Sequence, residues 1–172
     1  MKKLCLVLVS IAFFNQSLSA QEESVANKVF YSELGGPGVI MSANFDSRFT
    51  SNERLGLGYR IGNGFGYSEI INQRDYVIRT YYSIPAGLNY VLGKPNSAHT
   101  FEIGAGLTFL TRKVSLYHYN NEKPGHVIGF LTFMYRKVPV NGGFSFRIGL
   151  TPIIGTGGDL CPSGAVGFGY AF

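Results

Sequence analysis

The sequence predicts an all-β protein, an eight-stranded antiparallel transmembrane β-barrel of the up-and-down type that follows an N-terminal signal peptide. Three observations lead to this fold class. Charged residues make up only 15% of the chain, whereas soluble domains carry about 25%. Apolar residues recur at every second position, which is the strand period. After residue 20, no stretch has the length and apolarity of a transmembrane helix.

The first 20 residues, MKKLCLVLVSIAFFNQSLSA, have the three parts of a secretory signal peptide. Lys2 and Lys3 form a basic start, and an apolar run of eleven residues, 4–14, precedes a set of small residues. This run is too short to span a membrane, which takes about 20 residues. We expect cleavage after Ala20 or Ser19, with an uncleaved amphipathic anchor as the alternative. Residues 21–28 then form a short N-terminal segment, and residues 29–172 form the barrel.

Alternation is clearest in residues 143–153, GFSFRIGLTPI, where large apolar side chains on one face oppose Ser, Arg, Gly and Thr on the other. Residues 99–109, 54–62 and 83–93 repeat the pattern, whereas 127–138 is apolar on both faces and leaves its phase undetermined. The eight expected strands are 28–35, 38–49, 54–67, 78–93, 99–112, 126–138, 143–154 and 163–172.

The expected connections alternate in length, as they do in membrane barrels. Short turns lie near 50–53, 94–98 and 139–142, and longer loops lie near 68–77, 113–125 and 155–162. The first connection, at 36–37, is shorter than this pattern requires. One bent strand from 28 to 49, kinked at its glycines, is the alternative, but it would leave seven strands where bacterial barrels normally have an even number.

The less apolar strand face combines glycines with charges, and this indicates a tight barrel interior. A predicted internal network of paired charges, which burial would require, consists of Arg60, Glu102, Arg147, Asp46 and Arg48. The opposite face carries almost no charge, as lipid contact demands. A soluble lipocalin-like lipid binder is the alternative, and it would point the alternating hydrophobic residues inward.

The final stretch, AVGFGYAF, shows the same two faces. We expect lipid contact on one face from Val166, Phe168, Tyr170 and Phe172. Gly167, Gly169 and Ala171 would then face the interior, and this strand would pair with the first to close the barrel.

Several segments resemble a family of small, largely uncharacterised outer-membrane β-barrels of the Bacteroidetes type: YSELGGPGVIMSANFDSRF, IPAGLNYVLGK, FEIGAGLTFL, GGFSFRIGLTPI and AVGFGYAF. The resemblance implies location in the bacterial outer membrane, with membrane lipids and the barrel-assembly machinery as partners. It also implies that Phe172, with the alternate hydrophobic residues before it, acts as the assembly signal. It brings no catalytic residues.

The functional expectation is a structural or surface-interaction role through the three longer loops, whose Tyr, Asn and Arg residues suit recognition. Ordinary polar loops with an interfacial tyrosine belt are the alternative interpretation. We expect no cofactor and no metal, because no metal-ligand spacing is present. Removal of Lys2 and Lys3 leaves a net charge of +3, which makes no case for nucleic acid. Cys161 is then the single cysteine and cannot form an internal disulfide.

Two other functions remain open at this stage. A lipid-modifying barrel enzyme would use His118 with Ser115 and Glu122, although nothing in the sequence fixes their geometry. A narrow channel is the other, although the interior of eight strands can be filled by side chains.

Overall fold

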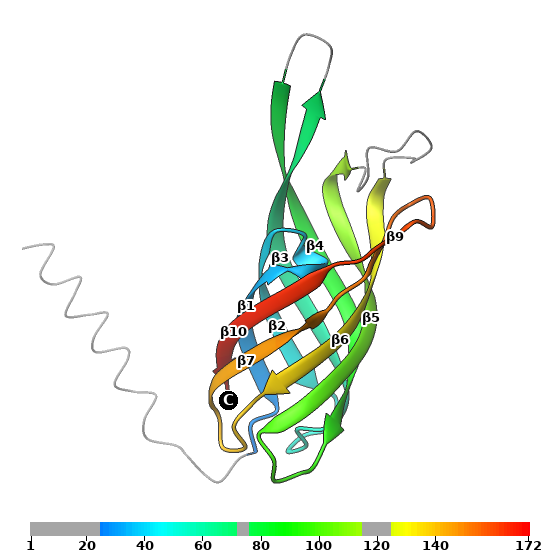
Figure 1. Cartoon of the computed structure of the whole chain (residues 1–172). Helices are drawn as coiled ribbons and strands as arrows, with labels where there is room; N and C mark the ends of the chain where they lie inside the picture. Colours follow the sequence, from blue (N-terminus) through cyan, green and yellow to red (C-terminus); the bar gives the residue numbers. More distant parts are fainter. Residues whose placement is uncertain (1–24, 72–75, 115–124) are drawn as a thin grey trace, which may run out of the picture.

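The computed structural model describes residues 25–71, 76–114 and 125–172 of the chain (Figure 1). The expected signal peptide lies outside these residues. The described residues are almost entirely β-structure. The barrel wall consists of β1 (Lys28–Gly35), β2 (Met41–Arg48), β3 (Gly56–Ile71), β4 (Tyr76–Gly93), β5 (His99–Val114), β6 (Gly125–Lys137), β7 (Gly143–Leu150) and β10 (Gly164–Ala171).

These strands form one closed antiparallel sheet in which sequential neighbours pair, and β7 pairs with β10. Strand β10 then pairs with β1, from Val29↔Ala171 to Gly35↔Ala165. The ladder is extended by two backbone hydrogen bonds that Lys28 and Phe172 exchange, at 3.0 and 2.9 Å. The prediction of a closed eight-stranded antiparallel β-barrel is therefore confirmed.

The strands fall into two length groups. Strands β3 to β6 have 16, 18, 16 and 13 residues, whereas β1, β2, β7 and β10 have eight each. The β3–β4 hairpin therefore extends far beyond β1 and β10 (Figure 1). We call this the hairpin end of the barrel, and we call the opposite end, with the connections 49–55, 94–98 and 138–142, the short-turn end.

Two of the expected loops are shorter than the sequence suggested. The β3–β4 ladder continues to Ile71↔Tyr76, so only 72–75 of the expected loop 68–77 is left outside strands, and those four residues are not described. The segment contains several β-branched residues, which favour strands. Strand β5 likewise continues to Val114, and residues 115–124 lie outside the described chain.

The first connection is a true hairpin and not a kink. Strands β1 and β2 pair from Lys28↔Ser47 to Leu34↔Met41. Between them, a 3₁₀ turn, η2 (Gly36–Gly38), is buried. The backbone enters the turn at Gly35 with φ 74° and leaves it at Val39 with φ 79°. A positive φ is unfavourable for a β-branched residue, so Val39 holds a strained conformation at the exit of a buried turn.

The expected strand 143–154 is interrupted at Pro152, which has no N–H to donate to the ladder. Strand β7 ends at Leu150, and the chain resumes pairing with β6 through the short strand β8 (Ile153–Ile154). Strand β9 (Leu160–Cys161) pairs with β8 inside the expected loop 155–162.

The register also fixes the phase of β6, which its sequence left undetermined. Ile128, Phe130 and Met134 are buried inside the barrel, whereas Phe133 and Tyr135 are exposed outside. The interior is therefore partly apolar, because this strand supplies large hydrophobic side chains to it.

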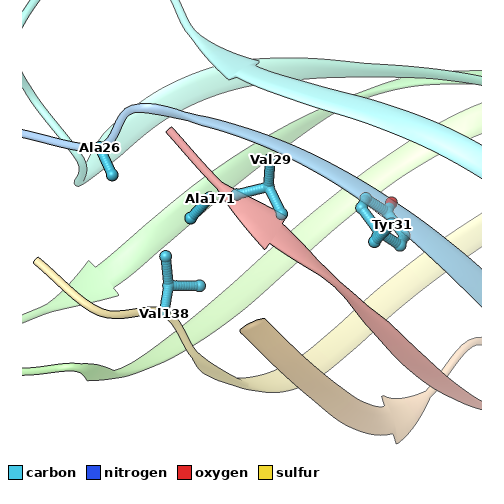
Figure 2. Close-up of a cluster of buried hydrophobic side chains, with 5 residues drawn as sticks. All are labelled: Ala26, Val29, Tyr31, Val138 and Ala171. Carbon is cyan, nitrogen blue, oxygen red and sulfur yellow. The ribbon is translucent and has the colours of Figure 1, made fainter. Parts of the chain in front are cut away.

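Apolar layers lie at both ends of the interior. At the short-turn end, Figure 2 shows a cluster of five buried side chains: Ala26, Val29, Tyr31, Val138 and Ala171. At the hairpin end, a second cluster consists of Tyr81, Leu110, Ile128 and Ile153, with Val39 and Cys161 packed against it. Close packing depends on glycine where a side chain would collide with the neighbouring strand, as a Cβ at Gly169 would with the Phe30 carbonyl and Tyr31.

Candidate functional site: the charged interior of the barrel

Polar and charged side chains fill the middle of the barrel interior and reach its short-turn end, where Asp46 is the ladder partner of Val29. The five residues that the sequence predicted as an internal network come from β2, β3, β5 and β7, and each is at most 5% exposed: Asp46, Arg48, Arg60, Glu102 and Arg147. Glu102, for example, points inward between the exposed side chains of Phe101 and Ile103, because successive residues of a strand face opposite sides of the sheet. The structure brings all five into one connected set of ion pairs, together with two residues that the sequence analysis missed.

The set begins at Asp46 on β2. Its Oδ1 lies 2.6 Å from Arg48 Nη2 and 3.3 Å from Arg136 Nη2. Asn89 donates a hydrogen bond from Nδ2 to Asp46 Oδ2. Arg48 also donates to Asn89 Oδ1 at 2.7 Å and to the Gly56 carbonyl at 3.0 Å. This carboxylate is therefore paired with two guanidinium groups and one amide.

Glu102 on β5 connects two arginines from the next two strands. Arg136 Nη1 lies 2.8 Å from Glu102 Oε2, and Arg147 Nη2 lies 2.9 Å from Oε1. Glu102 has no exposed surface. Because Arg136 also binds Asp46, it joins the first carboxylate to the second.

Glu33 on β1 completes the set. Arg60 Nη2 donates to Glu33 Oε1 at 3.0 Å. Arg147 Nε lies 3.3 Å from Oε2, a charge contact that lacks hydrogen-bond geometry. The Arg60 guanidinium lies 5.7 Å from the Tyr31 ring centre and 5.6 Å from that of Phe130, and Arg147 lies 4.4 Å from Tyr31. Cation–π contacts therefore add to the ion pairs.

Opposite charges alternate along the whole set, in the order Arg48, Asp46, Arg136, Glu102, Arg147, Glu33, Arg60. We call this set the interior ion chain. The two residues missed by the sequence analysis are Glu33 and Arg136. Glu33 shares the inward face of β1 with Val29 and Tyr31, as the alternating burial of this strand shows. Arg136 lies on the strand whose phase the sequence left undetermined.

The short-turn end is closed by a further buried arginine, Arg54, from the connection between β2 and β3. Its Nη1 donates to the carbonyls of Ser97 at 2.7 Å and Pro95 at 3.3 Å, and its Nη2 donates to the carbonyl of Val138. One side chain thus joins the three short connections. Burial, and then the nearby charge of Arg136, lower the pKa of Arg54 from its ordinary value.

The hairpin end is closed by η2. Ser83 on β4 donates to the Gly38 carbonyl at 2.9 Å, and Thr108 on β5 donates to the Pro37 carbonyl at 2.8 Å. Strand β5 lies directly across the barrel from β1, and β4 is its neighbour in the sheet. The turn therefore crosses the interior and is held from the far wall.

The closing strand, β10, has an outward and an inward face. Phe168, Tyr170 and Phe172 are 49%, 62% and 53% exposed on the outside of the barrel, and Val166 is half-buried. Ala171 has no exposed surface.

The residues considered for catalysis, His118, Ser115 and Glu122, lie outside the described chain. His99 is on the exterior rim, where Nδ1 lies 2.5 Å from the Tyr135 hydroxyl. Cys161 is a free thiol. Within the described residues, no group of three His, Cys, Asp or Glu side chains could hold a metal ion, and no helix is long and apolar enough to cross a membrane.

The fold and this site define the class of protein: a small closed β-barrel with a charged, filled interior and an apolar exterior. Comparison of the chain with protein-family models, with curated proteins and with solved structures finds no match.

Proposed function

We propose that this protein is an outer-membrane β-barrel that spans the bilayer and has a structural or surface-interaction role. The observation that supports this proposal is a continuous band of large apolar side chains on the outside of all eight wall strands. Each wall strand contributes at least one exposed side chain to this band. In strand order these include Phe30, Met41, Tyr67, Tyr82, Leu107, Phe133, Leu150 and Tyr170.

Such a band is unfavourable in water, because it leaves a large apolar surface hydrated. Soluble monomers rarely expose contiguous apolar patches larger than a few hundred Å², and larger patches mark interaction surfaces. Lipid accepts it, and a closed sheet leaves no unpaired backbone edge in the wall, as the bilayer requires. Exposed charged residues lie at the two ends of the wall. Those at the short-turn end are Lys28, Glu53, Lys94 and Lys137, and those at the hairpin end are Arg79, Arg112, Lys113 and Asp159. An apolar band between two charged rims is the arrangement that a bilayer selects.

The interior argues against two of the alternatives, a soluble lipid carrier and an open channel. A soluble lipid carrier needs an apolar cavity, whereas this interior is filled by the ion chain. An open channel needs a continuous passage, whereas Arg54 closes one end and η2 closes the other. A non-conducting barrel that presents its longer hairpins outside the cell fits these features best.

The resemblance to small outer-membrane β-barrels implies export from the cytoplasm and insertion by the barrel-assembly machinery. We propose that residues 1–20 direct export and are removed, and that Phe172 and the alternate residues before it are recognised by the barrel-assembly machinery. The hairpin end would face outward, with the ends of the β3–β4 and β5–β6 hairpins available to an extracellular partner.

The experiment that tests membrane insertion combines cell fractionation with gel mobility. A folded membrane barrel is expected in the outer-membrane fraction and should migrate differently before and after boiling. Recovery from the periplasm as a soluble protein of one mobility would overturn the proposal.

A paired substitution sharpens this test. Leu107 is an outward residue in the middle of β5 and 49% exposed. Leu107→Arg should reduce stability in lipid vesicles by about 2–4 kcal/mol, the cost of arginine at the bilayer midplane. Ser51→Arg, in an exposed short turn, is the matched control and should cost less than about 1 kcal/mol. Equal effects of the two substitutions would argue that the apolar band does not contact lipid.

A further inference from the structure

We propose that a small cavity at the short-turn end of the interior binds one monatomic anion, with chloride as the natural ligand. The inference rests on the interior alone and does not depend on where in the cell the barrel lies.

The cavity lies between the interior ion chain and Arg54. Its volume is about 10 Å³, which is enough for one water-sized species. Its polar lining consists of Asn27, Asp46, Arg48, Arg54, Thr100 and Arg136, and its apolar lining consists of Ala26, Val29, Val91 and Val138. Three arginines therefore line the cavity against one aspartate.

The charge balance of the whole interior points the same way. Among the described residues, the buried charged side chains are five arginines, namely Arg48, Arg54, Arg60, Arg136 and Arg147, and three carboxylates, namely Glu33, Asp46 and Glu102. Burial of unpaired charge is costly. A bound anion would offset part of this excess, and the cavity is the place where the arginines outnumber the carboxylates most.

Arg54 supplies an available donor. Its residue surface is 8% exposed, and its Nε is buried without a hydrogen-bond partner. The partners of its other nitrogens are neutral carbonyl groups of three turns, so no carboxylate neutralises this guanidinium. The lowered pKa of Arg54, caused first by burial and then by Arg136, agrees with an uncompensated positive charge at this position.

The size and chemistry of the cavity select among ligands. A metal cation would be repelled by the charges of three lining arginines, and a phosphate or sulfate is larger than the space allows. A water molecule fits and would accept a hydrogen bond, but it leaves the excess charge in place. A halide ion is larger than water but smaller than phosphate or sulfate, and it supplies the negative charge that water lacks.

The direct test is diffraction from crystals of the folded protein grown in sodium bromide, because bromide scatters anomalously and water does not. The expected result is an anomalous peak in the cavity, within reach of the arginine side chains. Crystals grown in bromide that show no anomalous peak there, with ordinary water density instead, would overturn the proposal.

The second test measures stability in different sodium salts at one ionic strength. Above the dissociation constant, each tenfold increase in chloride or bromide should raise the folding equilibrium constant about tenfold. Sulfate should not reproduce this effect. An equal response to all anions would indicate general screening and would contradict a bound halide.

Arg54→Gln should abolish the difference between chloride and sulfate. The matched control is Arg112→Gln, an exposed arginine on β5 toward the opposite end, which should retain the difference. Arg54 also joins three turns, so Arg54→Gln could lose stability for that reason alone. The bromide experiment on the unaltered protein does not depend on this variant.

Discussion

The middle and the hairpin end of the barrel interior are built on different physical principles, although the same strands supply both. In the middle, inward positions carry charges whose pairing depends on geometry, as at Glu102 between Arg136 and Arg147. At the hairpin end, inward positions of β4, β5 and β6 carry Tyr81, Leu110 and Ile128, which pack without charge. Alternation with a period of two thus determines which residues point inward. It does not determine whether the inward residues at a given height of the barrel are charged or apolar.

The difference has consequences for how each region responds to substitution. A buried ion pair adds little stability relative to a hydrophobic replacement of both partners, but loss of one partner leaves an uncompensated charge. An apolar cluster loses stability in proportion to the atoms removed and the cavity left behind. The middle should therefore be the more sensitive of the two regions to a single isosteric change.

The largest effect is expected for Glu102→Gln, which keeps the shape of the side chain and removes its charge from between two arginines. The free energy of unfolding should fall by about 3–5 kcal/mol, measured by urea titration of the protein folded in detergent micelles. Glu53→Gln, in an exposed turn, is the control and should change it by less than about 0.5 kcal/mol. Similar values for the two variants would mean that loss of one charged partner from the interior ion chain does not destabilise the barrel.

A smaller loss is expected for Leu110→Ala in the hairpin-end cluster. Leu110 is 5% exposed, and its truncation should cost about 3 kcal/mol in the same titration. Leu160→Ala, at a position 60% exposed on β9, should cost less than about 1 kcal/mol. If Leu110→Ala proves as mild as Leu160→Ala, the hairpin end is not packed as a core.

The turn η2 lies between the two regions, and Thr108→Val tests how firmly it is held. The substitution removes the donor to the buried Pro37 carbonyl, so a loss of about 1–2 kcal/mol is expected. Thr80→Val, at an exposed position of β4, serves as the control. Combination with Ser83→Ala should give a non-additive effect, because both hydroxyl groups hold the same turn. Strict additivity would argue that they act independently.

The smallest effect should come from outside the interior. Tyr135→Phe removes the exterior hydroxyl that contacts His99, and a cost of about 0.5 kcal/mol is expected for a hydrogen bond at an exposed rim. A cost as large as that of Glu102→Gln would mean that the exterior rim is as sensitive to substitution as the charged interior, which would contradict the expected difference.

The sequence predicted most of the wall, because alternation identifies a strand and its two faces wherever one face is polar. It could not assign the phase of β6, whose inward Phe130 and outward Phe133 are equally apolar. It therefore missed Arg136, although the same residue connects Asp46 to Glu102.

Other features could not be predicted from the local sequence pattern, because they depend on contacts between distant segments. Arg54 looks like an ordinary turn residue, and its role depends on three connections meeting at one end of the barrel. The inward fold of η2 depends in the same way on hydroxyl groups from the far wall, which are distant in sequence. The ends of the longer strands also depend on pairing between β3 and β4, which continues as far as Ile71 and Tyr76.

The pairing of β1 with β10 has a consequence for the order of folding. These two strands are the most widely separated in the described chain, and their ladder is the one that closes the barrel. Until β10 arrives, β1 and β7 each present an open edge, and such edges pair readily with other chains. Closure also requires a contact of very high sequence separation, which slows folding. Before closure the sheet would carry two open edges, and a surface or a partner protein that covered both edges would prevent them from pairing with other chains.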